Sequence, residues 1–113
     1  NLWGYLKGFT IFLLYFKLSH SKKELNVMKI KTLNGNVNII GKNIKKYRKL
    51  RKMSQPEICR QLDLLGVTMY NCDIYEIEYG KKTVKDFEVL AFCKVLGITL
   101  EDLYSDTEKY YEA

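Results

Sequence analysis

Apolar residues recur every three or four positions along this 113-residue chain from Ile40 onward. That spacing places them on one face of an α-helix, because the helix turns once every 3.6 residues. The pattern predicts five helices, over about residues 41–52, 54–65, 70–79, 83–96 and 100–104. We therefore expect an all-α domain over residues 40–105, followed by an acidic tail over residues 106–113 that frays.

Polar residues and glycines mark the ends of the predicted helices. Ser54 and Glu57 have the spacing of a capping box, and Pro56 is tolerated only in a first turn. Thr83-x-x-Asp86 and Thr99-x-x-Asp102 predict the starts of the last two helices in the same way. The expected C-terminal caps are Gly66, Gly80 and Gly97.

The predicted core comes from the inward positions of these helices. Ile40, Ile44, Tyr47 and Arg51 share one face of the first helix, and lysines occupy the rest. The other residues expected to point inward are Ile58, Leu62, Leu65, Val67, Met69, Ile74, Ile77, Val84, Phe87, Leu90, Ala91, Val95, Leu100 and Leu103. A chain of this length has room for one domain with a modest core.

The first 18 residues form an apolar, aromatic run that Lys7 and two glycines interrupt. A transmembrane helix needs about 20 apolar residues without a central charge, and a secretory signal needs a basic start and a small-residue cleavage site. The run is compatible with a membrane anchor, or with upstream sequence that precedes a start at Met28. The second interpretation is favoured because the chain opens with Asn1. We expect residues 1–39 to be an N-terminal extension outside the core, and we do not expect a membrane partner.

Residues 27–40 alternate apolar and polar positions on both sides of Asn34-Gly35. That dipeptide is a strong signal for a two-residue hairpin turn. An isolated two-stranded hairpin is only marginally stable in water, so an extended or weakly paired linker fits this segment equally well. We assign the segment no function.

Positive charge is concentrated in one part of the chain. The formal net charge is +6 and the pI is about 9.2. Residues 41–53 carry seven basic groups and no acidic one, whereas residues 41–113 together have a net charge of only +1. The chain can therefore attract an acidic partner such as nucleic acid, but only through a local surface.

Little in the sequence points to catalysis or metal binding. Cys59, Cys72 and Cys93 lie at no metal-ligand spacing, and we expect buried free thiols in a reducing, cytoplasmic compartment. His20 stands alone in a polar stretch, which favours a solvated side chain. No glycine-rich phosphate loop, carboxylate pair or activated nucleophile can be picked out. We expect no enzyme activity, no cofactor, no metal and no small-molecule substrate.

Several motifs follow one another in the order used by a known family. Ser54-Gln55 matches the Ser/Thr-Gln start of that family's first motif helix, and Cys59 matches its small position where two helices touch. Ile74 and Ile77 match the buried pair of the next helix, and Glu78-Tyr79-Gly80-Lys81 matches its exit. Flanking matches are Ile44-x-x-Tyr47-Arg48 upstream and Phe87, Leu90, Ala91, Val95, Leu96 and Gly97 downstream. Residues 40–104 thus resemble the lambda-repressor-like helix-turn-helix family, also called the Cro/repressor or Xre type.

The resemblance implies a compact five-helix domain that binds double-stranded DNA sequence-specifically, as a prokaryotic or phage transcriptional regulator, and is compatible with a homodimer. Helix 70–79 would enter the major groove. The base-reading positions would be Asn71, Cys72 and Glu76. Backbone contacts would come from Gln55, Tyr70, Tyr75, Lys81, Lys82 and Lys42. Arg48 and Glu78 would form a structural ion pair that fixes the first helix onto the third.

Two features of the sequence depart from the family pattern. The connection from Leu62 to Tyr70 is several residues longer than in the compact members. Residues 70–79 contain Asp73, Glu76 and Glu78 and no cation, so this helix would bring acidic groups to a polyanion. The alternative functions are a protein-interaction or antitoxin-like module with little DNA binding, and a regulator tethered to a membrane by residues 1–18.

Overall fold

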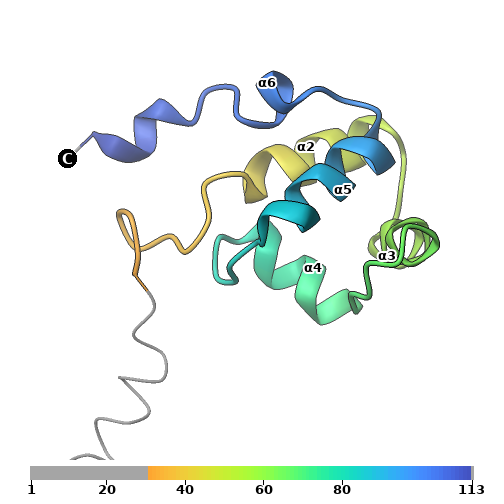
Figure 1. The fold of residues 1–113 in the computed structure, drawn as a ribbon. Coiled ribbons are helices and arrows are strands. Elements are labelled where there is room, and N and C mark those ends of the chain that lie inside the picture. The colour runs from red at the N-terminus through yellow and green to blue at the C-terminus, as the bar shows by residue number, and fades with distance from the viewer. Residues whose placement is uncertain (1–30, 113) are drawn as a thin grey trace, which may run out of the picture. The chain divides into compact units, whose positions relative to one another are not determined.

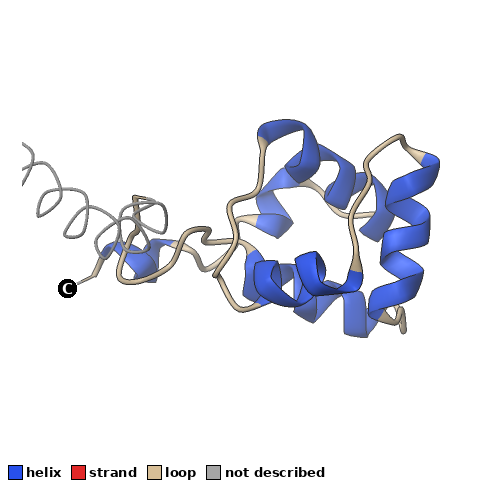
Figure 2. Cartoon of the chain, turned by 90° about the horizontal axis from the view of Figure 1, so that it is seen from below, coloured by secondary structure: helices blue, strands red, loops and turns tan. Residues whose placement is uncertain are grey.

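The computed structural model describes residues 31–112, and within this range the fold is all-α (Figures 1 and 2). No strand occurs in these residues, which agrees with the all-α prediction for residues 40–105. The helices are α2 (Gly41–Leu50), α3 (Gln55–Leu64), α4 (Asn71–Glu78), α5 (Asp86–Leu96), α6 (Leu100–Leu103) and the short 3₁₀-helix η1 (Glu108–Tyr111).

The helices pack around one hydrophobic core. Figure 1 shows α2 and α5 side by side, with α4 beneath them and α3 beyond the end of α5. Helix α4 contacts both α2 and α3, and α5 contacts α2, α3 and α6. The buried apolar residues are Ile40, Ile44, Ile58, Leu62, Met69, Ile74, Ile77, Val89, Ala91, Phe92, Cys93, Leu96 and Leu103. Burial of these side chains is the main favourable term holding the helices together.

Helix α2 ends two residues earlier than predicted. Lys52 has a φ of 56°, in the left-handed region that ends a helix. The N–H of the next residue, Met53, donates to the carbonyl of Arg48 at 3.0 Å, and Lys52 N–H donates to Lys49 at 3.0 Å. These two bonds form a Schellman motif. The predicted end at residue 52 was wrong because a lysine takes the left-handed capping conformation that usually marks a glycine.

The start of α3 agrees with the sequence, whereas the start of α5 does not. Ser54 Oγ accepts the N–H of Glu57 at 3.2 Å, as expected of the N-cap. Helix α5 begins at Asp86 rather than near Thr83. A carboxylate oxygen of Glu88 accepts the N–H of Lys85 at 2.8 Å. This bond satisfies a backbone donor at the helix start, and it moves the N-cap to Lys85.

The buried face of α5 also differs from the prediction. Val89, Phe92, Cys93 and Leu96 point into the core at the spacing of one helical face. The predicted inward residues Phe87 and Leu90 are 56% and 49% exposed. Leu65 and Leu100 were also predicted to be core residues, and this prediction was wrong because both are about half exposed. Periodicity could not select the right face because apolar residues surround α5 on nearly all sides.

The segment before α2 and the tail after α6 are both ordered. Leu33 and Asn36 form an isolated antiparallel bridge around Asn34 and Gly35, which have φ values of 53° and 79°. The hairpin signal thus produces a two-residue turn without a longer ladder. The side-chain amide of Asn34 donates to the carbonyls of Tyr110 and Glu112. The prediction that the tail frays was wrong, because η1 forms there and contacts this turn.

The interpretations of residues 1–18 as an anchor and of Met28 as a start fall outside residues 31–112. Within that range, none of the helices combines the length and the apolar character needed to cross a bilayer.

Candidate functional site

One side of α4 is exposed along its whole length. Its outward residues are Asn71, Cys72, Tyr75, Glu76 and the C-cap Tyr79. These positions share one face because successive members are one or three residues apart on the helix. We call this set of five residues the α4 face. The three residues predicted to read bases lie together on it, and so does Tyr75.

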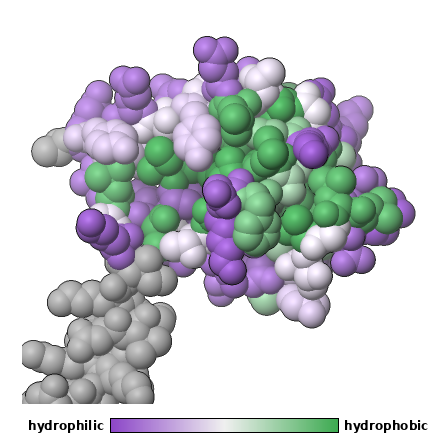
Figure 3. Space-filling view, viewed as in Figure 1, coloured by the Kyte–Doolittle hydropathy of each residue, from purple (hydrophilic) through white to green (hydrophobic). Residues whose placement is uncertain are grey.

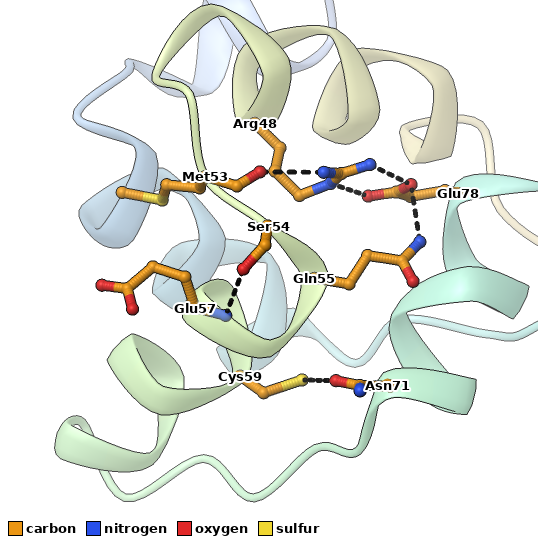
Figure 4. Close-up of polar contacts among 8 residues, drawn as sticks. All are labelled: Arg48, Met53, Ser54, Gln55, Glu57, Cys59, Asn71 and Glu78. Atoms are coloured by element: carbon orange, nitrogen blue, oxygen red, sulfur yellow. Dashed lines mark hydrogen bonds and ion pairs between the residues drawn. The ribbon is translucent and has the colours of Figure 1, made fainter.

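The C-terminal end of α4 is fixed by a buried ion pair (Figure 4). Arg48 Nε lies 2.6 Å from Glu78 Oε2, and Arg48 Nη2 lies 3.1 Å from Oε1. Arg48 Nη1 also donates to the carbonyl of Met53 at 2.8 Å. The bidentate geometry connects α2 to α4, and the third bond connects both to the segment before α3. Among the side-chain nitrogen and oxygen atoms that are buried in residues 31–112, none lacks a hydrogen-bond partner.

Gln55 belongs to the same network rather than standing free for a ligand. Its amide nitrogen donates to Glu78 Oε1 at 3.3 Å, and Figure 4 shows the side chain lying beside the ion pair. The side chain is only partly exposed. This predicted backbone-contacting residue therefore also orients Glu78, and a role at a phosphate would share the amide with the network.

The first residue of α4 contacts α3 through a thiol. Cys59 Sγ lies 3.6 Å from Asn71 Oδ1 (Figure 4). Burial raises the pKa of the Cys59 thiol, so it donates to the amide oxygen in its neutral form. Asn71 itself is exposed on the α4 face. The prediction that Cys59 occupies the contact between the two helices agrees with this geometry.

Asp73 is neutralised on α4 and does not present a free charge. Its Oδ2 accepts the N–H of Tyr70 at 2.9 Å, and its Oδ1 lies 2.7 Å from Lys82 Nζ. The hydrogen bond from Lys82 lowers the pKa of Asp73, and the bond from Tyr70 lowers it further. The pair offsets the charge that Asp73 was expected to bring to a polyanion, and it engages Lys82, which was predicted to hold the DNA backbone.

The cysteines do not share one environment. Cys93 is buried in α5, and burial raises the pKa of its thiol. Cys59 is partly exposed. Cys72 is exposed on the α4 face, so the prediction that all three thiols are buried was wrong for Cys72. Cys72 lies two residues before the buried Ile74. Positions two residues apart point to nearly opposite sides of an α-helix, so Cys72 lies on the outward side of α4.

Lys45 of α2 lies beside the C-terminal end of the α4 face. The rings of Tyr75 and Tyr79 are 4.7 Å apart, and Lys45 Nζ lies 5.3 Å from the centroid of Tyr79. Lys42 and Lys81 are exposed. Lys45 thus borders a face that carries tyrosines and Glu76 but no cation of its own.

Two residues that the sequence did not single out set the distance between α2 and α4. A methyl group on Gly41 would overlap the carbonyl oxygen of Ile77, so the two backbones are in direct contact. Asn38 Nδ2 donates to the carbonyls of Ile77 and Lys82, at 3.1 and 2.7 Å. Asn38 Oδ1 accepts the N–H of Gly41 at 2.8 Å. An asparagine just before a helix is a capping signal, but no local pattern in the sequence predicts its bonds to the carbonyls of Ile77 and Lys82.

Residues 31–112 contain no group of three or more His, Cys, Asp or Glu side chains placed to hold a metal ion. No protein-family model, curated protein or solved structure matches the chain. The assignment of this site therefore depends on its own geometry and chemistry.

Proposed function

We propose that α3 and α4 form a helix-turn-helix unit of the lambda-repressor-like type, and that the α4 face enters the major groove of duplex DNA. The chain would act as a sequence-specific regulator of transcription. The observation that carries the proposal is the side of α4 opposite the buried Ile77, where Asn71, Cys72 and Glu76 are exposed together. A helix fixed on one side and polar on the other suits groove readout, because base edges require side chains held in register.

The side chains of the α4 face match the chemistry of base edges. An asparagine amide can bond adenine at N6 and N7, and a glutamate carboxylate can accept from the amino group of cytosine. Asn71 is held at its oxygen by the Cys59 thiol, 3.6 Å away, which limits the rotation of the amide. We infer that Asn71 is the most specific reader and that Glu76 selects against sites lacking a cytosine amino group.

Contacts to the phosphate backbone of the DNA would come from cations outside α4. Lys81 and Lys42 are exposed and free to contact phosphates, whereas Lys82 first has to leave Asp73. Each phosphate neutralised by a cation releases counterions, so binding should weaken steeply with salt. With so few free cations, we expect moderate affinity for each copy of the chain.

Titration of labelled duplex DNA with the full chain, over a range of salt concentrations, tests the proposal. Glu76→Gln should raise affinity for random duplex, because it removes a negative charge next to phosphates, and should weaken the preference at one base pair. Glu101→Gln is the matched control, since it makes the same charge change on exposed α6. Equal effects of the two variants would contradict a DNA-facing Glu76.

A second candidate function is recognition of another protein by the same face. Tyr70, Tyr75 and Tyr79 are 68%, 54% and 53% exposed, and tyrosine is enriched in protein-binding surfaces. Residues 70–79 also lack a cation. Absence of DNA binding even at low salt would support this function over the first.

A further inference from the structure

The turn over residues 33–36 contains a reactive dipeptide. Of the seven asparagines in the sequence, only Asn34 is followed by glycine. The side-chain amide of an asparagine is open to attack by the backbone nitrogen of the next residue, and glycine hinders this attack least because it has no side chain. Asn34 and Gly35 are both exposed, and nothing lies within 4 Å of the place that a Cβ on Gly35 would take. The turn is therefore accessible to the attack and to water.

The nitrogen that would attack is not engaged in the turn. The two bonds of the isolated bridge use the N–H groups that flank Asn34-Gly35, at 2.8 and 3.0 Å. Among the hydrogen bonds formed within residues 31–112, none has the N–H of Gly35 as its donor. The nitrogen that follows Asn36 belongs to Val37, and it donates to the carbonyl of Gly80 at 2.8 Å. The attack on Asn34 thus breaks no hydrogen bond at the attacking nitrogen, whereas an attack on Asn36 does.

The side chain of Asn34 also holds the C-terminal tail. Its amide nitrogen donates to the carbonyls of Tyr110 and Glu112, at 2.5 and 2.9 Å. Among the hydrogen bonds formed within residues 31–112, no other bond joins residues 108–112 to a residue before Asp106. Figures 1 and 2 show η1 beside this turn at one end of the domain.

Hydrogen bonds carry much of this attachment. No residue of η1 is buried, and Figure 3 shows many hydrophilic side chains at the edge of the domain where η1 lies. Both acceptors of the Asn34 amide are carbonyl oxygens, so only an N–H donor can face them. The position of η1 therefore depends on the amide form of Asn34.

We propose that Asn34 is a site of spontaneous deamidation, and that the reaction releases η1. The backbone nitrogen of Gly35 attacks Cγ of Asn34 and forms a cyclic imide. The bond from Cγ to the side-chain nitrogen breaks, and this nitrogen leaves as ammonia with the proton from Gly35. Water then opens the ring to aspartate or to isoaspartate, so water is the only other reactant.

Both products remove the bonds to the tail. In aspartate a carboxylate replaces the amide, and an ionised carboxylate accepts hydrogen bonds but donates none. It would repel the carbonyls of Tyr110 and Glu112, which the amide now binds. Isoaspartate places the carboxylate on Cα and lengthens the backbone by a methylene, in a turn that closes over only two residues. Because the ammonia is lost, release of the tail proceeds in one direction and accumulates with time. No residue of the α4 face takes part, so the release does not depend on the ligand of that face.

Incubation of the full chain at neutral pH, followed by tryptic digestion and mass spectrometry, tests the reaction. Residues 32–42 form one tryptic peptide with Asn34, Asn36 and Asn38, so fragment ions compare the three sites directly. A sample digested without incubation gives the background. Asn34 should lose most of its amide before loss at the other two is detected. Conversion of Asn34 that is no faster than that of Asn36 would overturn the proposal.

Asn34→Asp reproduces one product and tests the release. The NMR order parameters of residues 108–112 should fall from about 0.85, typical of rigid backbone, to below about 0.6. Asn36→Asp is the matched control, since it makes the same charge change in the same turn but replaces an amide that bonds only to the carbonyls of residues 33 and 34. The tail of this variant should stay ordered.

Circular dichroism checks that each variant is helical, and the deamidated fraction of the parent chain gives the same measurement if Asn34→Asp does not fold. A tail that stays ordered in the deamidated chain would overturn the release. An equal loss of order in Asn36→Asp would also overturn it, because the turn as a whole, and not the Asn34 amide, would then hold η1.

Discussion

Arg48 Nε and Glu78 Oε2 are 2.6 Å apart across the contact between α2 and α4, and the two side chains are 10% and 1% exposed. They lie 30 residues apart in the chain. The pair therefore connects the basic helix α2 to the helix that carries the candidate site. Because both charges are out of water, each depends on the other, and Arg48 also depends on the carbonyl of Met53.

We expect Arg48→Ala and Glu78→Ala each to destabilise the fold by about 3–5 kcal/mol, because each strands a buried charge. The double variant should lose less than the sum of the two. Urea denaturation of the four proteins gives the coupling free energy. Arg60 and Glu57 are a control pair, bonded at 2.8 Å but lying on the exposed side of α3, and their truncation should change stability little. Additive losses for Arg48 and Glu78 would contradict the coupling.

The left-handed conformation of Lys52 predicts a stabilising substitution. This conformation costs an L-residue about 1–2 kcal/mol, and the extra freedom of glycine in the unfolded chain offsets about 0.5–1 kcal/mol. Lys52→Gly should therefore stabilise the fold by roughly 0.5–1 kcal/mol, seen as a higher melting temperature. Lys49→Gly, inside α2, should instead destabilise it by about 1 kcal/mol. A loss of stability in Lys52→Gly would contradict the assignment of Lys52 to the helix cap.

The Asp73–Lys82 pair predicts a dependence of stability on pH. The pKa of Asp73 is below the ordinary value of 3.8 in the folded protein, so between these two values the unfolded chain binds more protons. The contribution of Asp73 is complete above about pH 4 and is lost as pH falls through the folded pKa. The stability difference between the parent chain and Asp73→Asn should be constant from pH 7 to 5 and should shrink toward pH 3. A difference that stays constant down to pH 3 would contradict the pair.

If the α4 face binds DNA, two substitutions separate base recognition from phosphate binding. Lys81→Ala should weaken binding to all sequences and lower the salt slope by about one unit. Asn71→Ala should cost on the order of 1–3 kcal/mol on the preferred site and little on others. Lys109→Ala removes a cation from η1 and serves as the charge control. A salt slope lowered equally by Lys109→Ala and Lys81→Ala would mean that Lys81 makes no specific phosphate contact.

Local signals in the sequence located most helix ends correctly. The Ser54 cap and the Thr99–Asp102 box form as expected, because each involves residues only three positions apart. The face of α5 could not be predicted, since eight of its eleven residues are apolar and several faces satisfy the helical period. Only the positions of α2 and α3 select the side that is buried.

Contacts between distant segments were the other part that the sequence could not supply. The motif resemblance, rather than periodicity, suggested the pairing of Arg48 with Glu78. The ion pair between Lys82 and Asp73 reduces the positive charge available to a ligand. Nothing in the sequence around these residues distinguishes Lys82 from Lys81. Asn38 was missed because its bonds reach across 39 and 44 residues.

The contact between Gly41 and the carbonyl of Ile77 separates what can vary in this protein from what cannot. No side chain fits at position 41, so the spacing of α2 from α4 is set by a contact between backbone atoms, which the side chain of Asn38 supports. Positions 71, 72 and 76 point outward and take no part in that spacing. Exchanging those three residues would therefore change the chemistry presented to a ligand while the scaffold keeps its dimensions, which makes this domain suitable for retargeting by surface substitution.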